Sequence, residues 1–135
     1  MKITCGVAIF NNKNQLLIGK ATNGNNWSIP KGLNENNETF EMSAIREVYE
    51  ETGIDISKSK LELVGEENYK NQSKKIIMFK TYLDYLDLNK VVCNSFFEYK
   101  IKKLPELDKF ELVTLNELHK YNIHNTQIIL LNKIY

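Results

Sequence analysis

Arginine is almost absent from this chain, and neither sign of charge dominates. Lysine supplies all of the 18 basic residues except Arg46. With 17 acidic residues against them, the net charge is only +1, which argues against a broad electrostatic surface for nucleic acid. A short RNA end held in a pocket remains compatible with this balance. A single arginine in a chain that otherwise uses lysine suggests a need for the planar guanidinium fork.

Cysteines and long apolar runs are scarce as well. Cys5 and Cys93 lack the paired spacing of a metal or redox motif. We expect two buried free thiols, with a single disulfide as the alternative. No apolar stretch approaches the roughly 20 residues that span a bilayer. The apolar run after Lys2 is broken by Asn11 and Asn12, so we expect no signal peptide, no membrane partner and a cytoplasmic protein.

The remaining composition fits one globular domain over residues 1–135. Hydrophobic residues make up 42% of the chain, which is enough for a proper core. Runs rich in β-branched and aromatic residues predict strands over residues 3–10, 15–20, 61–66, 75–83, 91–102 and 111–115. Helices are predicted over residues 40–52, 115–121 and 126–134.

Two local features near the C-terminus refine this prediction. Thr114 and Glu117 have the spacing of a capping box, which places a helix start directly after Thr114. His119 and His124 are expected on the surface or in packing rather than as metal ligands. Periodicity alone therefore gives an α plus β protein and no chemistry.

The most informative stretch runs from Gly32 to Ile54. Glu38 follows the first glycine after five residues, and the tripeptide that begins at Arg46 follows after seven more. A pair of glutamates and then Gly53 complete the pattern. The whole stretch reads GLNENNETFEMSAIREVYEETGI.

Within this stretch, an uninterrupted helix is expected to gather negative charge on one flank. Glu47, Glu50 and Glu51 stand at i, i+3 and i+4, so their side chains share a flank. Like charges at these spacings destabilise a bare helix by about a few tenths of a kcal/mol per pair. Carboxylate clusters suit Mg²⁺ or Mn²⁺, which would offset the repulsion, whereas a solvated acidic face is the alternative. The opposite flank, expected to pack on the core, carries Met42, Ile45, Val48 and Tyr49.

The spacing of these residues resembles the signature of the Nudix hydrolases at every defined position. Trp27, Pro30 and Lys31, just before the stretch, are similar to that family too. The resemblance implies an α/β/α sandwich around a mixed β-sheet, with a short strand before the motif loop. Where the family often has a glycine before the first glutamate, this chain has Asn37, a residue that tolerates positive φ.

The resemblance also implies roles for the motif residues. Glu47, Glu50 and Glu51, with the Gly32 carbonyl, would be metal ligands. Arg46 would hold a glutamate by a bidentate pair. Glu38 would support the cluster or a further ion.

Other assignments stay open at this point. In some family members the first glutamate of the helix, here Glu47, assists as general base, and in others a carboxylate on a distant loop does so. Glu98 and Glu106 are the candidates for such a carboxylate, against the alternative of solvent-facing acids. Lys31 is a candidate phosphate ligand. Candidates for a base-stacking slot, each with a core position as the alternative, are Trp27, Tyr69, Phe79, Tyr82 and Phe97.

The function implied is a Mg²⁺-dependent pyrophosphohydrolase of a nucleoside polyphosphate. Pro30-Lys31-Gly32 is similar to diadenosine polyphosphate hydrolases, which favours a dinucleoside polyphosphate such as diadenosine tetraphosphate. Hydrolysis of 8-oxo-dGTP and removal of pyrophosphate from an RNA 5′ end are the alternatives. A catalytically silent nucleotide-binding module of the same fold is a rival of a different class, although such relatives typically lose a motif acid. The signature fixes the reaction better than the substrate, and it leaves the oligomeric state open.

Overall fold

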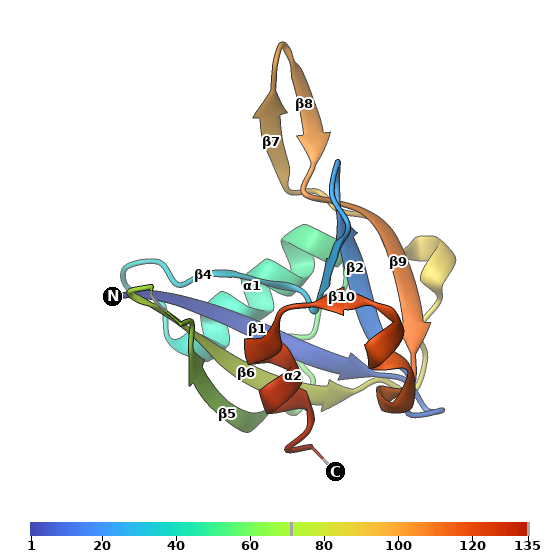
Figure 1. The fold of residues 1–135 in the computed structure, drawn as a ribbon. Helices are drawn as coiled ribbons and strands as arrows, with labels where there is room; N and C mark the ends of the chain where they lie inside the picture. The colour runs from blue at the N-terminus through green and yellow to red at the C-terminus, as the bar shows by residue number, and fades with distance from the viewer. Residues whose placement is uncertain (71, 135) are drawn as a thin grey trace.

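The computed structural model describes residues 1–70 and 72–134 of the chain (Figure 1). The strands of the main sheet are β1 (Lys2–Phe10), β2 (Leu16–Ala21), β3 (Asn26–Ser28), β4 (Lys31–Leu33), β5 (Glu62–Asn68), β6 (Lys74–Tyr82), β9 (Leu107–Val113) and β10 (Asn122–Ile123). A separate hairpin consists of β7 (Phe96–Tyr99) and β8 (Lys102–Pro105). The helices are α1 (Phe40–Thr52) and α2 (Asn125–Leu131), with 3-10 helices η1 (Leu88–Lys90) and η2 (Leu115–Lys120).

The main sheet is mixed and is built around β1. Its order is β10-β3-β2-β1-β6-β5, with β4 paired to β1 and β9 paired to β2. β1 runs parallel to β6 over its whole length and antiparallel to β2 and β4. The β1–β4 pairing brings Gly32 opposite Cys5, which places the motif loop at the sheet.

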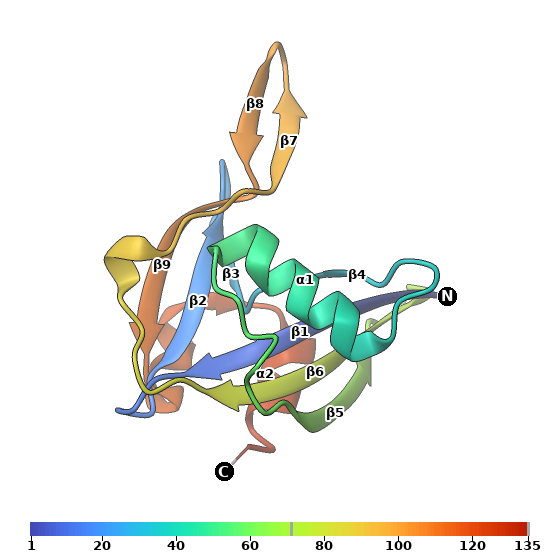
Figure 2. The same cartoon turned by 180° about the vertical axis from the view of Figure 1, so that it is seen from behind.

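Alternation along β1 sends side chains into two cores, one on each face of the sheet. Ala8 and Phe10 face α2, where Leu130 and Leu131 pack against them. Val7 and Ile9 face α1 and form the second core. The two views show α2 on one side of the sheet and α1 on the other (Figures 1 and 2). The α/β/α sandwich around a mixed sheet is therefore confirmed.

Helix α1 has the predicted bounds because both of its ends are capped. The Thr39 hydroxyl accepts a hydrogen bond from the Met42 amide at 3.1 Å. At the other end, Gly53 adopts φ 77° and its amide donates to the Tyr49 carbonyl. A residue with a side chain would be strained in this left-handed conformation.

The prediction of which flank of α1 is buried was wrong in part, since Val48 is buried and Ile45 packs against the core but the other two residues do not. Met42 and Tyr49 are about half exposed. The buried stripe instead consists of Ser43, Ala44, Glu47, Val48, Glu51 and Thr52. Strand β4 packs beside the acidic residues, so apolar and acidic side chains share one stripe instead of opposing each other.

The predicted single strand over residues 91–102 was also wrong. The first strand is only Phe96–Tyr99, and the chain then turns back at once into β8, which extends past the predicted end to Pro105. Pro105 fits because it lies at the end of a hairpin strand that no further strand joins. The hairpin projects from the rest of the molecule (Figures 1 and 2).

Several smaller expectations can also be compared with the structure. The capping box at Thr114 and Glu117 is present, and it starts a 3-10 helix. Cys5 and Cys93 are buried free thiols, as expected. Within the described residues, no helix is both long enough and apolar enough to cross a membrane.

The cap of α1 yields a stability prediction. Gly53→Ala should lower the free energy of unfolding by about 1–2 kcal/mol, because alanine disfavours the left-handed conformation. Gly24→Ala is the matched control, since Gly24 has ordinary backbone geometry and only loose neighbours. Urea titration of both variants measures the difference. Equal stabilities would show that the conformation of Gly53 is not a constraint.

Candidate active site

Arg46 lies at the centre of a cluster of carboxylates. Its Nε and Nη2 atoms donate to the two oxygens of Glu38 at 2.8 and 3.0 Å, which forms a bidentate pair. Its Nη1 atom donates to Glu47 at 2.8 Å and to Glu50 at 3.3 Å. Nη2 also reaches the Leu33 carbonyl at 2.9 Å. One guanidinium therefore ties the motif loop to the helix, a geometry that the ammonium of lysine cannot reproduce.

Glu38 belongs to a loop that is held on the helix from several sides. Ser43 donates to Glu38 at 2.7 Å, and Asn34 donates to Ser43 at 2.7 Å. The hydrogen bond from Arg46, followed by that from Ser43, lowers the pKa of Glu38 to about 2. Asn37 adopts φ 73°, the conformation that its side chain was expected to tolerate. The loop therefore presents Glu38 as a fixed anion.

Glu47 is buried directly against Gly32. A Cβ atom on residue 32 would lie 2.0 Å from the Cδ of Glu47, so only glycine leaves room for this carboxylate. Burial raises the pKa of Glu47, while the hydrogen bond from Arg46 opposes the rise. The motif glycine thus serves packing, in addition to any role of its carbonyl.

Glu51 is the most strongly perturbed acid of the cluster. Only 6% of it is exposed, and the Lys31 amide donates to its Oε1 atom at 3.0 Å. Burial raises the pKa of Glu51 to about 8, against the opposing effects of that hydrogen bond and of the Lys31 charge. The negative charges of Glu47 and Glu106 raise it further. A cation at this position would be strongly favoured.

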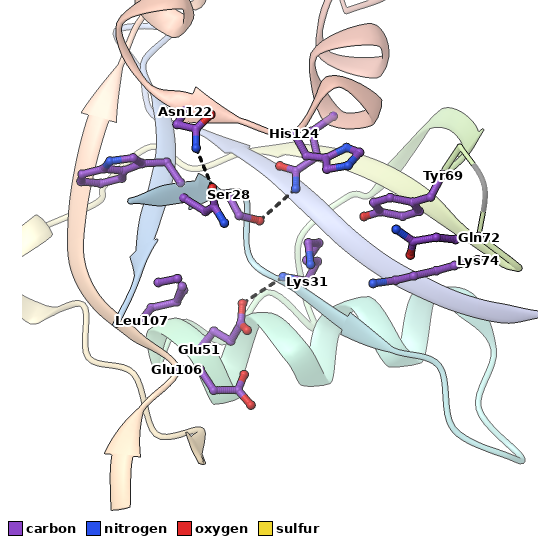
Figure 3. Close-up of a pocket in the computed structure, with 14 residues that line it drawn as sticks. Ser28, Lys31, Glu51, Tyr69, Gln72, Lys74, Glu106, Leu107, Asn122 and His124 are labelled. Atoms are coloured by element: carbon purple, nitrogen blue, oxygen red, sulfur yellow. Dashed lines mark hydrogen bonds between the residues drawn. The ribbon is translucent and has the colours of Figure 1, made fainter. Parts of the chain in front are cut away.

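A pocket of about 470 Å³ opens beside Glu51 (Figure 3). Glu106 lies at the same end as Glu51, whereas Tyr69, Gln72 and Lys74 group away from them. The wall combines acids, amides, one histidine and two aromatic residues. Its lining residues are Ala21, Asn26, Trp27, Ser28, Lys31, Glu51, Tyr69, Gln72, Lys74, Glu106, Leu107, Asn122, His124 and Gln127.

Three of the predicted substrate contacts line this pocket, although not all as expected. Lys31 lies next to Glu51, and Trp27 packs edge-on against Tyr121 at 5.2 Å. Tyr69 is only 7% exposed. Its ring centroid lies 4.8 Å from the centroid of the His124 ring and 4.7 Å from the Nζ atom of Lys74. Tyr69 therefore shapes the wall but does not offer an open ring face for stacking.

Phe79 and Glu98 lie elsewhere. Phe79 is buried in the core beneath α1, and Glu98 is exposed on β7 opposite Lys103. Of the two predicted loop carboxylates, the structure brings only Glu106 to the pocket. Glu106 follows directly after β8, and its amide donates to the Ser95 carbonyl at 2.8 Å, which fixes its position.

Sequence reasoning missed the contribution of α2 to the pocket. Gln127 is 1% exposed, accepts from the Ile29 amide at 3.1 Å and donates to the Ser28 hydroxyl at 3.0 Å. His124 caps α2 and lines the pocket, although it was expected only on the surface or in packing. A buried glutamine in an apolar helix was the available signal, since a buried amide requires partners.

The acid cluster has the chemistry of a divalent metal site, although its side chains do not converge as they stand. Among the described residues, no three His, Cys, Asp or Glu side chains are grouped closely enough to hold a metal ion. Arg46 hydrogen-bonds to Glu47 and Glu50, which draws both carboxylates to itself. Carboxylates that are buried, with pKa values raised by burial, nevertheless fit a hard cation with oxygen ligands. Binding would require rotation of side chains, not a new backbone.

Known proteins resemble this chain in both sequence and structure. An RNA pyrophosphohydrolase of Histophilus somni (strain 2336) is 41% identical over 49 residues, which are 36% of this chain and 26% of the relative. The mRNA-decapping enzyme subunit 2 of Arabidopsis thaliana is 38% identical over 56 residues, which are 42% of this chain and 15% of the relative. These two matches span about a quarter or less of each relative's length.

Structural similarity extends over nearly the whole chain. A C. elegans Ap4A hydrolase, solved as a binary complex, superposes with a TM-score of 0.75. The match covers 98% of this chain and 94% of that one at 20% sequence identity, so it shows the fold alone. The family model described as NUDIX domain matches residues 2–132. Because that match spans almost all of the chain, the protein belongs to the Nudix family.

Proposed function

We propose that this protein is a Mg²⁺-dependent pyrophosphohydrolase of nucleoside polyphosphates, with Mn²⁺ as a substitute ion, acting in the cytoplasm. The observation that carries the proposal is the pair of buried carboxylates, Glu47 and Glu51, of which Glu51 lines a pocket of nucleotide size. Glu50 and the Gly32 carbonyl would complete the ligand set, with Glu38 as support. A bound divalent ion would neutralise phosphate oxygens and lower the pKa of a water molecule.

Other residues of the chain would bind and orient the substrate. The amide of Lys31 fixes Glu51, and the Lys31 ammonium would contact a phosphate in the same pocket. Arg46 would act as a positioning residue, because its bonds set where Glu38, Glu47 and Glu50 point. Complete retention of the motif acids favours an enzyme over a silent binding module.

Glu106 is the carboxylate that we favour as general base. It lines the pocket at the Glu51 end, whereas Glu98 lies on the projecting hairpin. A general base must come within hydrogen-bond reach of the proton that it removes, directly or through one water molecule. Glu47 stays the alternative, although Arg46 donates a hydrogen bond to it and it does not line the pocket.

For the substrate, we propose a dinucleoside polyphosphate such as diadenosine tetraphosphate. A pocket of about 470 Å³ accommodates one nucleotide moiety, and the remaining polyphosphate would lie along Lys31 and the acid cluster. An RNA 5′ end is the second candidate, favoured by the 41% identity to an RNA pyrophosphohydrolase. A screen with Mg²⁺ across dinucleoside polyphosphates, nucleoside triphosphates, 8-oxo-dGTP, ADP-ribose and triphosphorylated RNA tests the proposal. A preference for 8-oxo-dGTP would overturn the substrate but not the reaction.

Loss of one proposed ligand should abolish most activity. Glu50→Gln keeps the shape of the side chain and removes its charge, so kcat should fall at least about 100-fold. Steady-state kinetics with Mg²⁺ measure the change. Glu41→Gln, an exposed change on the same helix, is the control and should retain normal turnover. Near-normal turnover of Glu50→Gln would refute the ligand assignment.

The fork of Arg46 should matter more than its charge. Arg46→Lys cannot make the bidentate pair with Glu38, so kcat/KM should fall at least about tenfold although the charge is kept. The melting temperature, measured alongside, separates a positioning effect from unfolding. If lysine supports full activity, Arg46 merely balances negative charge.

The raised pKa of Glu51 makes the metal-free protein sensitive to pH. Its folded pKa of about 8 lies well above the ordinary pKa of a glutamate, so its carboxyl favours folding at low pH, and that stability is lost as pH rises through 8. Glu51→Gln stays neutral, and in EDTA it should be more stable than wild type above pH 8 by at least about 1 kcal/mol. The gap should close toward pH 4.5. Urea titrations at several pH values measure it, and a gap independent of pH would contradict the burial of a charged Glu51.

The two candidate loop carboxylates can be separated by a matched pair of variants. Glu106→Gln should lower kcat at least about 100-fold and remove the acidic limb of the pH–rate profile, as expected for loss of a general base. Glu98→Gln makes the same chemical change outside the pocket and should leave kcat and the pH–rate profile unchanged. Loss of activity in Glu98→Gln alone would reverse the assignment.

A further inference from the structure

The β7–β8 hairpin carries exposed residues that the fold does not use. Exposed fractions are 54% for Phe96, 47% for Tyr99 and 98% for Ile101, the residue at the tip. The hairpin forms its own two-stranded sheet and pairs with no strand of the main sheet. An isolated two-stranded hairpin is marginally stable in water, so these apolar side chains do not contribute to a core.

The same hairpin concentrates positive charge in a nearly neutral protein. Lys100, Lys102 and Lys103 are exposed and face only one acid of the hairpin, Glu98. In the part of the chain that the structure describes, none of these three lysines forms an ion pair. Lys100 lies over the Tyr99 ring at 5.4 Å. Because side chains alternate along a strand, Tyr99 and Lys102 share one face of the hairpin, whereas Phe96 shares the other face with Glu98 and Lys103. Each face thus carries a partly exposed ring and a lysine, a combination that suits an anionic chain with flat groups.

The base of the hairpin is part of the pocket wall. Glu106 and Leu107, which follow β8 directly, both line the pocket. The Glu106 amide donates to Ser95, and its carbonyl accepts from the Thr22 amide at 3.1 Å, so the hairpin leaves the body at a fixed point. A polymer whose end occupies the pocket would therefore leave the pocket beside the hairpin.

We propose that the β7–β8 hairpin is a binding arm for single-stranded RNA whose 5′-phosphorylated end occupies the pocket. Lys100 and Lys102 contact phosphates, and the ring of Tyr99 on the same face as Lys102 stacks on a base. Tyr99 and Lys102 are cross-strand partners on one face, which places a ring and a cation side by side. Contact with a second copy of the hairpin is disfavoured because each carries three lysines against one glutamate. The proposal rests on the proposed function and takes its second substrate candidate, an RNA 5′ end, as the occupant of the pocket.

Binding is measured apart from catalysis, by fluorescence anisotropy of a short single-stranded RNA with a 5′-triphosphate and a 3′ label, in EDTA. The variant Lys100→Gln/Lys102→Gln/Lys103→Gln should weaken binding by at least about tenfold, and should lower the slope of log Kd against log salt by about 2. Tyr99→Ala should weaken binding by at least about fivefold through loss of stacking. The control Lys58→Gln/Lys60→Gln/Lys90→Gln removes the same charge from exposed sites elsewhere and should bind normally.

The two proposals fail in different ways. The hairpin triple variant should hydrolyse diadenosine tetraphosphate with unchanged kcat/KM, because none of its lysines lines the pocket. An unchanged RNA Kd in that variant would overturn the binding arm, whatever the enzyme hydrolyses. Hairpin-dependent binding to anionic phosphatidylserine vesicles in preference to RNA would overturn it too. So would a dimer, detected by sedimentation, that the hairpin substitutions dissociate without loss of RNA binding.

Discussion

The guanidinium of Arg46 is the interaction on which the rest of the site depends. It binds Glu38 through a two-point pair and also reaches Glu47, Glu50 and the Leu33 carbonyl. These bonds join a loop, a strand and a helix that would otherwise be held apart by like charges. The only arginine of the chain is thus the residue that makes the acidic helix compatible with its surroundings.

One cation does not neutralise the whole cluster. Glu51 receives a hydrogen bond from the Lys31 amide but remains buried, and its pKa rises to about 8. Burial destabilises the ionised carboxylate of Glu51 in the metal-free fold. The same burial favours a divalent ion beside it, because the ion would neutralise the charge. Stability of the metal-free fold and metal affinity therefore oppose each other at Glu51. Glu47 is likewise a buried carboxylate, and Gly32 leaves the narrow space that it occupies.

The motif helix and its loop could be predicted because their constraints are local. The bounds of α1 follow from an uninterrupted run that ends at Gly53, and the positive φ of Asn37 follows from the chemistry of asparagine. The buried flank could be predicted only in part. Val48 was expected to face away from Glu47, yet both are buried, because β4 packs beside the acids. That contact depends on strand pairing between distant segments, which helical periodicity does not encode.

The same limit applies to the pocket wall. Glu106 and Glu98 were equal candidates by sequence, and only the turn at Lys100, which folds β8 back on β7, separates them in space. Lys100 adopts φ 59°, a conformation that the presence of a lysine in the sequence does not predict. Tyr69 was a candidate for stacking on substrate, with a core position as the alternative, and the structure buries it because His124 and Lys74 cover its ring.

Direct binding of Mn²⁺ tests most sharply whether the acidic stripe of α1 is a metal site. Electron paramagnetic resonance counts the free ion as protein is added, without any substrate or turnover. Wild type should bind at least one ion per chain, and Glu41→Gln should match it. The double variant Glu50→Gln/Glu51→Gln should leave the ion free. Undiminished Mn²⁺ binding by the double variant would show that the cluster held together by Arg46 is not where the metal binds.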